Sequence, residues 1–397
     1  MTQAPIAKAF VHEAEQLLME LLAIPGISCH ELRVMEFLDA KLRQAGIGDS
    51  SIQFDQAHRH SPHGGDVGNL LCRLSGSRPG KRRLLLAHVD TVPICQATVP
   101  VRRGRWILSG NKRSGLGADD RTGAAAILAA ALELVRQGLP HPPLTFLWTV
   151  QEEIGLAGAR HVRLGLLGRP HMAFNFDGGA VDKITVGATG GYRMTIGVTG
   201  IAAHSGACPE RGVNAITIAA LAIAELQREG WLGRIEKQGR TGTSNIGVIH
   251  GGEATNVVAP LVVLRAEARS HERAFREEIV RAFQEAFGKA ARSVGNAEGA
   301  CGKVEFDGEL DYEAFRLSDD DPSALAAESA LRQLGSRPVR NISNGGLDAN
   351  WLFARGIPTV SLGCGQVDGH TVSERVDRQE FHRACRLALR LALGDGP

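Results

Sequence analysis

The chain has 397 residues, of which 43% are hydrophobic and 22% are charged, and its formal net charge is +2. At about 150 residues per domain, this length predicts two or three domains with a core large enough to leave a cleft. Because the charges nearly balance and no long run of lysine and arginine occurs, the composition argues against a protein that binds nucleic acid or a membrane surface.

The N-terminal residues 1–26 are expected to form an amphipathic helix with acidic side chains, without the apolar core of a signal peptide. No segment reaches the roughly 18 apolar residues of a membrane-spanning helix. The seven cysteines are widely spread and form no CxxC pair, so neither a disulfide framework nor a cysteine zinc site is indicated. These features predict a cytoplasmic protein with reduced thiols.

Buried strands then alternate with helices. Strands are expected at 81–89, 144–150 and 172–177, and helices at 121–138 and 155–167. Such alternation builds βαβ units and an α/β fold, in which a mostly parallel sheet is flanked by helices on both faces. The same pattern returns near the C-terminus, with a closing helix preceded by elements at 322–335 (helix), 347–356 (helix) and 358–363 (strand).

The pattern between these two stretches is different. A strand–helix–strand–strand–helix–strand order is expected at 184–200, 213–230, 243–252, 257–270, 271–295 and 302–310. This order is the ferredoxin-like α+β arrangement, which can fold as its own domain. Its second helix has an apolar stripe that predicts packing on a sheet, formed by Phe275, Ile279, Phe283 and Phe287. We therefore expect a first domain made of 1–187 and 313–397, with a second domain inserted at 188–312.

Five clusters of polar side chains interrupt the apolar pattern at strand ends or at a helix start. They are His88 with Asp90, Asp119 with Asp120, Glu152 with Glu153, Asp177, and His370. Each cluster alone has a structural explanation, such as an N-cap at the helix start. However, ligands of an open parallel sheet bind beyond the carboxyl ends of its strands. One site built from several strand ends explains the coincidence of all five clusters.

The residue types in these clusters indicate a metal site. Imidazoles and carboxylates without thiolates suit a borderline divalent cation, which predicts Zn²⁺, although Co²⁺ and Mn²⁺ also fit. A single catalytic ion takes about three protein ligands. This sequence offers five candidates, His88, Asp119, Glu153, Asp177 and His370. That number suffices for two ions that share a bridging carboxylate.

Two neighbours of the candidate ligands are expected to support them. Asp90 lies two residues from His88, so on an extended segment it can accept the other ring N–H of that histidine. Glu152 and Glu153 are adjacent, and consecutive side chains on extended backbone point in opposite directions. One of the two glutamates can therefore bind metal while the other is free to act as a general base.

With these residues in place, the chain resembles the aminoacylase, carboxypeptidase G and peptidase T family of di-zinc metallopeptidases. The likeness runs from LLLAHVDTVP to GHTVSERV. Its details are most similar to peptidase T-like tripeptidases, through GADDRTG, WTVQEEIG, NFDGG, GIAAHSG, NGGLDANWL and GIPTVSLG. The resemblance implies that His88 and Asp177 hold one metal, that Glu153 and His370 hold the other, and that Asp119 bridges them.

The resemblance also implies roles for residues outside the metal ligands. Glu152 would be the general base, with Asp90 as the partner of the metal-binding histidine. The inserted domain would be a lid and a dimerisation surface, which predicts a homodimer. Its His204, in GIAAHSG, would support the oxyanion in its own site or in a partner's, although a turn residue is the structural alternative.

Three further positions are compared with relatives. Asn256, in GGEATNVV, and Arg269, in LRAEARS, match positions that face the substrate carboxylate in relatives. An arginine fork suits that bidentate contact, but a surface arginine on a strand is the default interpretation. Arg121 stands where relatives often carry lysine, so the charge is kept while the geometry changes.

The sequence thus predicts a metal-dependent hydrolase of peptide-type amide bonds. The leading hypothesis is an aminopeptidase that removes the N-terminal residue from small peptides, through attack by metal-bound hydroxide with Glu152 as general base. An N-acyl-amino-acid deacylase or a carboxypeptidase of the same architecture is the first alternative. A metal-dependent binding protein without catalysis is the second, although a binding site has no use for a free base. GxSxG, HExxH and GxxxxGK[ST] motifs are absent.

Overall fold

The computed structural model describes residues 8–394, and the first seven residues of the expected N-terminal helix lie outside this range. The chain forms two compact units. Unit 1 comprises residues up to Gly187, Arg316–Ser343 and the segment from Leu347 onward, and unit 2 comprises Ala188–Phe315 and Asn344–Gly346. Among the helices of the described residues, none combines the length and apolar character needed to cross a bilayer.

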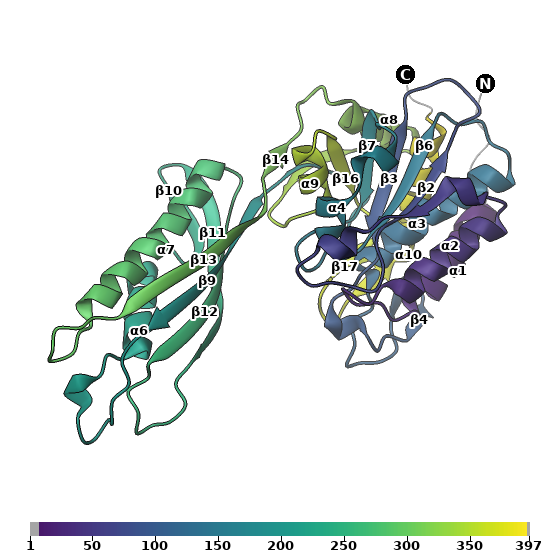
Figure 1. The fold of residues 1–397 in the computed structure, drawn as a ribbon. Helices are drawn as coiled ribbons and strands as arrows, with labels where there is room; N and C mark the ends of the chain where they lie inside the picture. Colours follow the sequence, from purple (N-terminus) through teal and green to yellow (C-terminus); the bar gives the residue numbers. More distant parts are fainter. Residues whose placement is uncertain (1–7, 395–397) are drawn as a thin grey trace. The chain divides into compact units, whose positions relative to one another are not determined.

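Unit 1 is built on a nine-stranded sheet with the order β1-β2-β6-β3-β7-β16-β8-β14, in which β15 also pairs with β8 (Figure 1). Its four central strands, β6, β3, β7 and β16, run parallel. The strands are β1 (Ile52–Phe54), β2 (Leu70–Leu74), β3 (Arg83–His88), β6 (Leu144–Thr149), β7 (Met172–Phe176), β8 (Lys183–Ala188), β14 (Phe315–Arg316), β15 (Val339–Ser343) and β16 (Thr359–Leu362).

Helices cover both faces of this sheet (Figure 1). Side chains on β6 show the two layers, because consecutive residues point to opposite faces. Leu147 packs with Val162 and Leu352 on one face, while the indole of Trp148 donates to the carbonyl of Ala124 on the other. The helices are α1 (Lys8–Leu22), α2 (Leu32–Gln44), α3 (Ala118–Arg136), α4 (Ala157–His161), α5 (Leu164–Leu167), α8 (Pro322–Gln333), α9 (Asp348–Ala354) and α10 (Arg378–Leu393).

A small four-stranded sheet in unit 1 has the order β17-β18-β5-β4. Its strands are β4 (Pro100–Arg103), β5 (Trp106–Ser109), β17 (Gln366–Val367) and β18 (Arg375–Asp377). Because β17 and β18 pair with each other and β18 pairs with β5, this sheet fixes both ends of the segment that contains His370. Single turns of 3₁₀ helix occur at Asp49–Ser51, Ala57–His60, Pro93–Cys95 and Pro209–Arg211.

Unit 2 is a five-stranded antiparallel sheet with the order β10-β11-β12-β9-β13. Both helices pack on one face, where the four residues of the predicted apolar stripe in α7 are completely buried. Without β10, the strand order is that of a ferredoxin-like unit. The elements are β9 (Gly190–Thr199), α6 (Ala215–Arg228), β10 (Gly233–Lys237), β11 (Arg240–Gly251), β12 (Leu261–Ser270), α7 (Arg273–Ser293) and β13 (Lys303–Tyr312).

The α/β fold class predicted from the sequence is confirmed, and two of the expected elements differ in detail. The expected strand at 184–200 is two strands, because β8 joins the large sheet and β9 joins the sheet of unit 2. The expected helix at 155–167 is divided into α4 and α5, with extended backbone at Val162 and Arg163 between them. Strand β10 adds an edge strand that the sequence pattern did not reveal.

Candidate metal centre

The carboxyl ends of three of the four parallel strands carry polar clusters, and two further segments add the rest. His88 is the last residue of β3, Asp177 follows β7, and Glu152 and Glu153 follow β6 by three and four residues. His370 lies in the connection between β17 and β18. Asp119 belongs to the first turn of α3, where the backbone of Asp119 and Asp120 is not helical. Five segments that are distant in sequence therefore meet at one edge of the sheet.

The five predicted ligands form two groups that share Asp119. One group is His88, Asp119 and Asp177, and the other is Asp119, Glu153 and His370; within each group the candidate ligand atoms lie within 4.8 Å of one another. One oxygen of Asp119 is 3.2 Å from Nε2 of His88, and its second oxygen is 3.3 Å from Nε2 of His370. Both distances are short enough for one metal ion to contact the two atoms of each pair.

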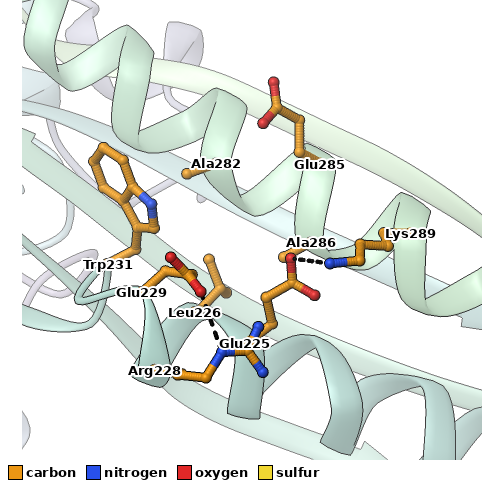
Figure 2. Close-up of a pocket in the computed structure, with 9 residues that line it drawn as sticks. All are labelled: Glu225, Leu226, Arg228, Glu229, Trp231, Ala282, Glu285, Ala286 and Lys289. Carbon is orange, nitrogen blue, oxygen red and sulfur yellow. Dashed lines mark hydrogen bonds and ion pairs between the residues drawn. The ribbon is translucent and has the colours of Figure 1, made fainter.

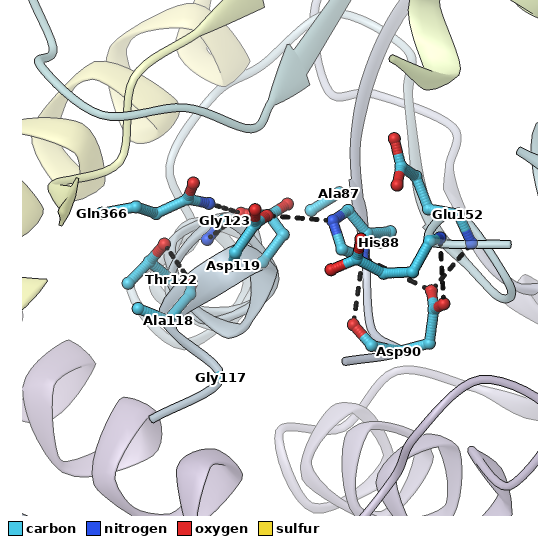
Figure 3. Close-up of polar contacts among 12 residues, drawn as sticks. Ala87, His88, Asp90, Gly117, Ala118, Asp119, Thr122, Gly123, Glu152 and Gln366 are labelled. Atoms are coloured by element: carbon cyan, nitrogen blue, oxygen red, sulfur yellow. Dashed lines mark hydrogen bonds and ion pairs between the residues drawn. The ribbon is translucent and has the colours of Figure 1, made fainter. Parts of the chain in front are cut away.

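Asp90 lies beneath this site and is completely buried (Figure 3). Its oxygens accept hydrogen bonds from the backbone N–H of Glu152 at 2.9 Å, from that of Glu153 at 3.2 Å, and from the hydroxyl of Ser28 at 2.7 Å. Nδ1 of His88 is 3.4 Å from one carboxylate oxygen and 3.1 Å from the backbone carbonyl of Asp90. Asp90 therefore positions both the histidine and the backbone of the two glutamates.

Burial strongly affects the acids of the site. It raises the pKa of Glu152 well above its usual range, with a further contribution from Asp177. Burial and the neighbouring Asp119 raise the pKa of Asp177 to about 7. Among the described residues, no lysine or arginine side chain pairs with either acid. Divalent cations would compensate this crowding of carboxylates, because they are large local positive charges. The donor set and its electrostatics therefore fit a pair of divalent metals.

Asp120 has a structural contact despite its place beside Asp119. Its oxygen Oδ1 accepts hydrogen bonds from the backbone N–H of Gly123 at 3.1 Å and from the amide of Gln366 at 2.7 Å. The first bond is of the helix-capping type, so the cap explanation holds for Asp120. Its other oxygen is buried without a hydrogen-bond partner in the described part of the chain.

Arg121 is buried, and its hydrogen bonds go to backbone carbonyls outside the candidate ligands. Its guanidinium donates to the carbonyl of Leu21 at 3.0 Å and to that of Gly26 at 3.2 Å. Burial lowers the pKa of this side chain to about 10. The contacts indicate that Arg121 ties the start of α3 to the segment that follows α1.

Three buried acids near the site did not emerge from the sequence. Glu31 accepts hydrogen bonds from the backbone N–H groups of Cys29 and Gln151, and burial with the nearby Asp90 raises its pKa to about 8. Asp348 accepts from the hydroxyl of Thr149. Glu374 accepts from the backbone that leads to Asp119. Periodicity could not find these acids, because they lie outside the strand ends; Glu374 and Asp348 do fall within the quoted motifs GHTVSERV and NGGLDANWL.

The remaining predicted site residues belong to unit 2. His204 is exposed, and its Nδ1 accepts the backbone N–H groups of Gly206 and Ala207, each at 3.1 Å. The neutral ring therefore carries its proton on Nε2, which is a donor. Asn256 lies beside this turn, because its backbone carbonyl accepts from the N–H of Ser205 at 3.0 Å.

Arg269 lies on β12, apart from this turn in sequence. Its guanidinium fork donates to both oxygens of Glu267, at 3.1 and 2.9 Å. A carboxylate partner for this arginine is therefore already present within unit 2.

A separate cavity of about 330 Å³ lies between α6 and α7 of unit 2 (Figure 2). Its charged side chains pair with one another, as Lys289 contacts Glu225 at 3.0 Å and Arg228 contacts Glu229 at 3.1 Å. None of the predicted site residues lines it. The cavity is therefore unrelated to the metal centre.

Comparisons with known proteins show the family of this chain. The sequence profile of peptidase family M20/M25/M40 matches residues 84–394. Protein YqjE of Bacillus subtilis is 31% identical over 371 residues, which cover 94% of this chain and 95% of that protein.

Two solved structures have the same fold over nearly the whole chain. A tripeptidase from Staphylococcus aureus has a TM-score of 0.85 and 30% identity, covering 96% of this chain and 97% of its own. Aminopeptidase PepT from Bacillus cereus has a TM-score of 0.81 and 31% identity, covering 96% and 98%. Because the profile spans most of the chain and the relatives span nearly all of it, the protein belongs to peptidase family M20/M25/M40, with a fold shared with peptidase T-like tripeptidases.

Proposed function

We propose that this protein is a two-metal aminopeptidase that removes the N-terminal residue from small peptides, with tripeptides as the leading substrates. The observation that carries the proposal is the pair of ligand groups that share Asp119. The tripeptidase and the aminopeptidase of similar structure support the choice of peptide substrate. The nitrogen and oxygen donors favour Zn²⁺, with Co²⁺ and Mn²⁺ as other candidates.

The chain's residues have separate roles in this proposal. When bound, two metals supply Lewis-acid polarisation of a carbonyl and lower the pKa of water. His88 and Asp177 would hold one ion, Glu153 and His370 the other, and Asp119 both. Glu152 would take the proton from the attacking water and return it to the leaving amine.

Residues of unit 2 are proposed to contact the substrate. The Nε2–H of His204 is an exposed donor suited to a developing oxyanion. Asn256 and Arg269 are proposed to bind the substrate carboxylate. To do so, Arg269 must break its hydrogen bonds to Glu267 and donate to the substrate carboxylate in their place. A H204A variant is expected to lower kcat while it binds metal as the wild type does. Unchanged kcat in this variant would remove His204 from the reaction.

A peptide panel tests the proposed activity. The purified protein, loaded with Zn²⁺, Co²⁺ or Mn²⁺ or treated with a chelator, is incubated with a free tripeptide, its N-acetylated form, its C-terminal amide and an N-acetyl amino acid. We expect loss of the N-terminal residue from the free tripeptide, slower loss from its C-terminal amide, which lacks the carboxylate proposed to contact Asn256 and Arg269, and no product after chelation, as detected by mass spectrometry.

Other products of the same panel identify the alternatives. Hydrolysis of the N-acetyl amino acid alone would indicate a deacylase, and release of the C-terminal residue would indicate a carboxypeptidase. A sample that binds two ions and hydrolyses nothing would indicate a metal-dependent binding protein.

Assembly and location are also proposals. A homodimer through unit 2 is supported by exposed apolar side chains on α6, where Ile216 and Leu221 are 45% and 46% exposed. Light scattering on the purified protein tests this, since a monomeric mass would contradict it.

A cytoplasmic location is supported by the seven cysteines, all of which are free thiols. Fractionation of cells tests that location.

A further inference from the structure

Glu374 lies between His370 and β18 and has only 2% of its surface exposed. Its oxygen Oε2 accepts hydrogen bonds from the backbone N–H groups of Leu116 at 2.8 Å and Gly117 at 2.6 Å. Its other oxygen, Oε1, accepts one from the backbone N–H of Asp119 at 3.1 Å. One carboxylate therefore holds most of the backbone donors of residues 116–119, which lead into the shared ligand of the two metal groups.

A buried thiol adds a donor from another segment. Sγ of Cys95 lies 3.4 Å from Oε2 of Glu374. Burial and the neighbouring carboxylate raise the pKa of this thiol, so it stays protonated and donates its hydrogen. The segment after β3, the segment before α3 and the segment after His370 thus meet at one carboxylate.

The glycines of this loop allow the close approach. A Cβ atom on Gly115 would lie 3.2 Å from Oε2 of Glu374 and 2.9 Å from the carbonyl oxygen of Thr371. Gly117 has a φ of +76°, and a Cβ atom there would lie 2.9 Å from Cγ2 of Thr91. A side chain at either position would push the loop away from the carboxylate of Glu374. The close contact between the loop and Glu374 therefore depends on both glycines.

We propose that Glu374 is a positioning residue that holds the backbone of residues 116–119 so that the carboxylate of Asp119 can bind two metal ions at once; this rests on the proposed function. A bridging ligand must face both ions, so a shift of its backbone weakens both. Because Glu374 follows His370 by four residues, it also links the shared ligand to a ligand of the second group. A carboxylate is needed because its two oxygens accept from four donors, whereas an amide offers only one acceptor oxygen.

The test compares E374Q with a matched control. In E374Q an NH₂ group would face backbone N–H donors, and we expect the Zn²⁺ affinity, measured by competition with a chromophoric chelator, to fall by about 10-fold to 100-fold. The absorption spectrum of the Co²⁺-loaded variant is expected to change as well. The control is D321A, which removes a buried acid that accepts the N–H groups of Ser323 and Ala324 at the start of α8. It should bind both metals as the wild type does.

Hydrogen exchange of the metal-free proteins provides a second readout. The segment 113–120 should exchange faster in E374Q than in the wild type, and D321A should leave it unchanged. If E374Q does not fold, E374D serves instead, because it keeps the charge but is too short to reach all the donors. Wild-type Zn²⁺ affinity and Co²⁺ spectrum in a folded Glu374 variant would overturn the proposal. A wild-type protein that binds fewer than two ions would instead contradict the proposed function.

Discussion

Glu152 and Glu153 are neighbours in sequence, yet their surroundings differ. Oε1 of Glu153 is 2.9 Å from Nε2 of His370, within a metal-ligand group. Glu152 is buried, belongs to neither group, and its backbone N–H is fixed by Asp90. The structure thus separates two residues of the same type into a candidate ligand and a candidate base.

E152Q tests the base. The amide has nearly the same shape and cannot take a proton, so we expect kcat on a cleaved peptide to fall by about 10²-fold to 10⁴-fold. The content of two metals per chain should be unchanged, as measured by elemental analysis. Turnover at the wild-type rate would remove Glu152 from the mechanism.

Arg121 is a second residue whose structure makes a clear prediction. Its two contacts to carbonyl oxygens require a planar fork, which lysine lacks. R121K is expected to destabilise the protein by about 1 to 3 kcal/mol, because at least one buried hydrogen bond from a charged donor is lost. The shift is measured by urea unfolding. R43K, at an exposed arginine paired with Asp39, is the control and should change stability by less than about 0.5 kcal/mol.

At the scale of elements, Glu15 joins three segments. This buried acid of α1 contacts Arg102 of β4 at 2.6 Å, and Arg378 and His382 of α10 at 3.0 and 2.8 Å. Burial opposes ionisation of Glu15, but hydrogen bonds from Arg378, His382 and Arg102 outweigh it and lower its pKa below the usual 4.5. The ionised side chain therefore stabilises the fold.

E15Q is expected to lower the free energy of unfolding at neutral pH by about 1 to 3 kcal/mol. This range is kept low because Arg102, Arg378 and His382 are partly exposed, and solvent weakens their ion pairs with Glu15. Because the folded-state pKa is depressed, this stabilisation is complete above the unfolded-state value and is lost as the pH falls through the folded-state value. The difference between the wild type and E15Q should therefore narrow below about pH 4. A difference that stays constant in urea unfolding from pH 7 to pH 3 would contradict the role of the charge.

At the scale of the whole molecule, the candidate ligands join segments from residue 88 to residue 370. Metals that bind only the folded chain stabilise it by mass action, by about 2.7 kcal/mol for one site at a free concentration 100 times its Kd. We expect a chelator to lower the Tm in thermal scanning and added Zn²⁺ to restore it. D119N, which weakens the shared ligand, should show a much smaller response. Equal Tm values for chelated and reloaded wild-type protein would contradict a metal site built across the fold.

Much of the fold could be predicted from the sequence, because local periodicity reports which faces are buried. The strand at 144–150 is apolar except for Thr145 and Thr149, and both faces of β6 are buried. The stripe from Phe275 to Phe287 packs as expected. Edge strand β10 escaped prediction, because only one of its five residues is buried and its pattern resembles a loop.

The sequence by itself determined the α/β class, the family and the five residues that gather in two groups, because buried strands and motif residues leave a local trace. The tertiary structure alone decided that Arg121 donates hydrogen bonds to the carbonyls of Leu21 and Gly26. It also decided that Glu374 accepts hydrogen bonds from the backbone of the loop that leads to Asp119. Both contacts are distant in sequence. Gly26 and Arg121 are separated by 95 positions, and Leu116 and Glu374 by 258 positions. Such pairings depend on chain topology and buried hydrogen bonding, which no local pattern of residues encodes.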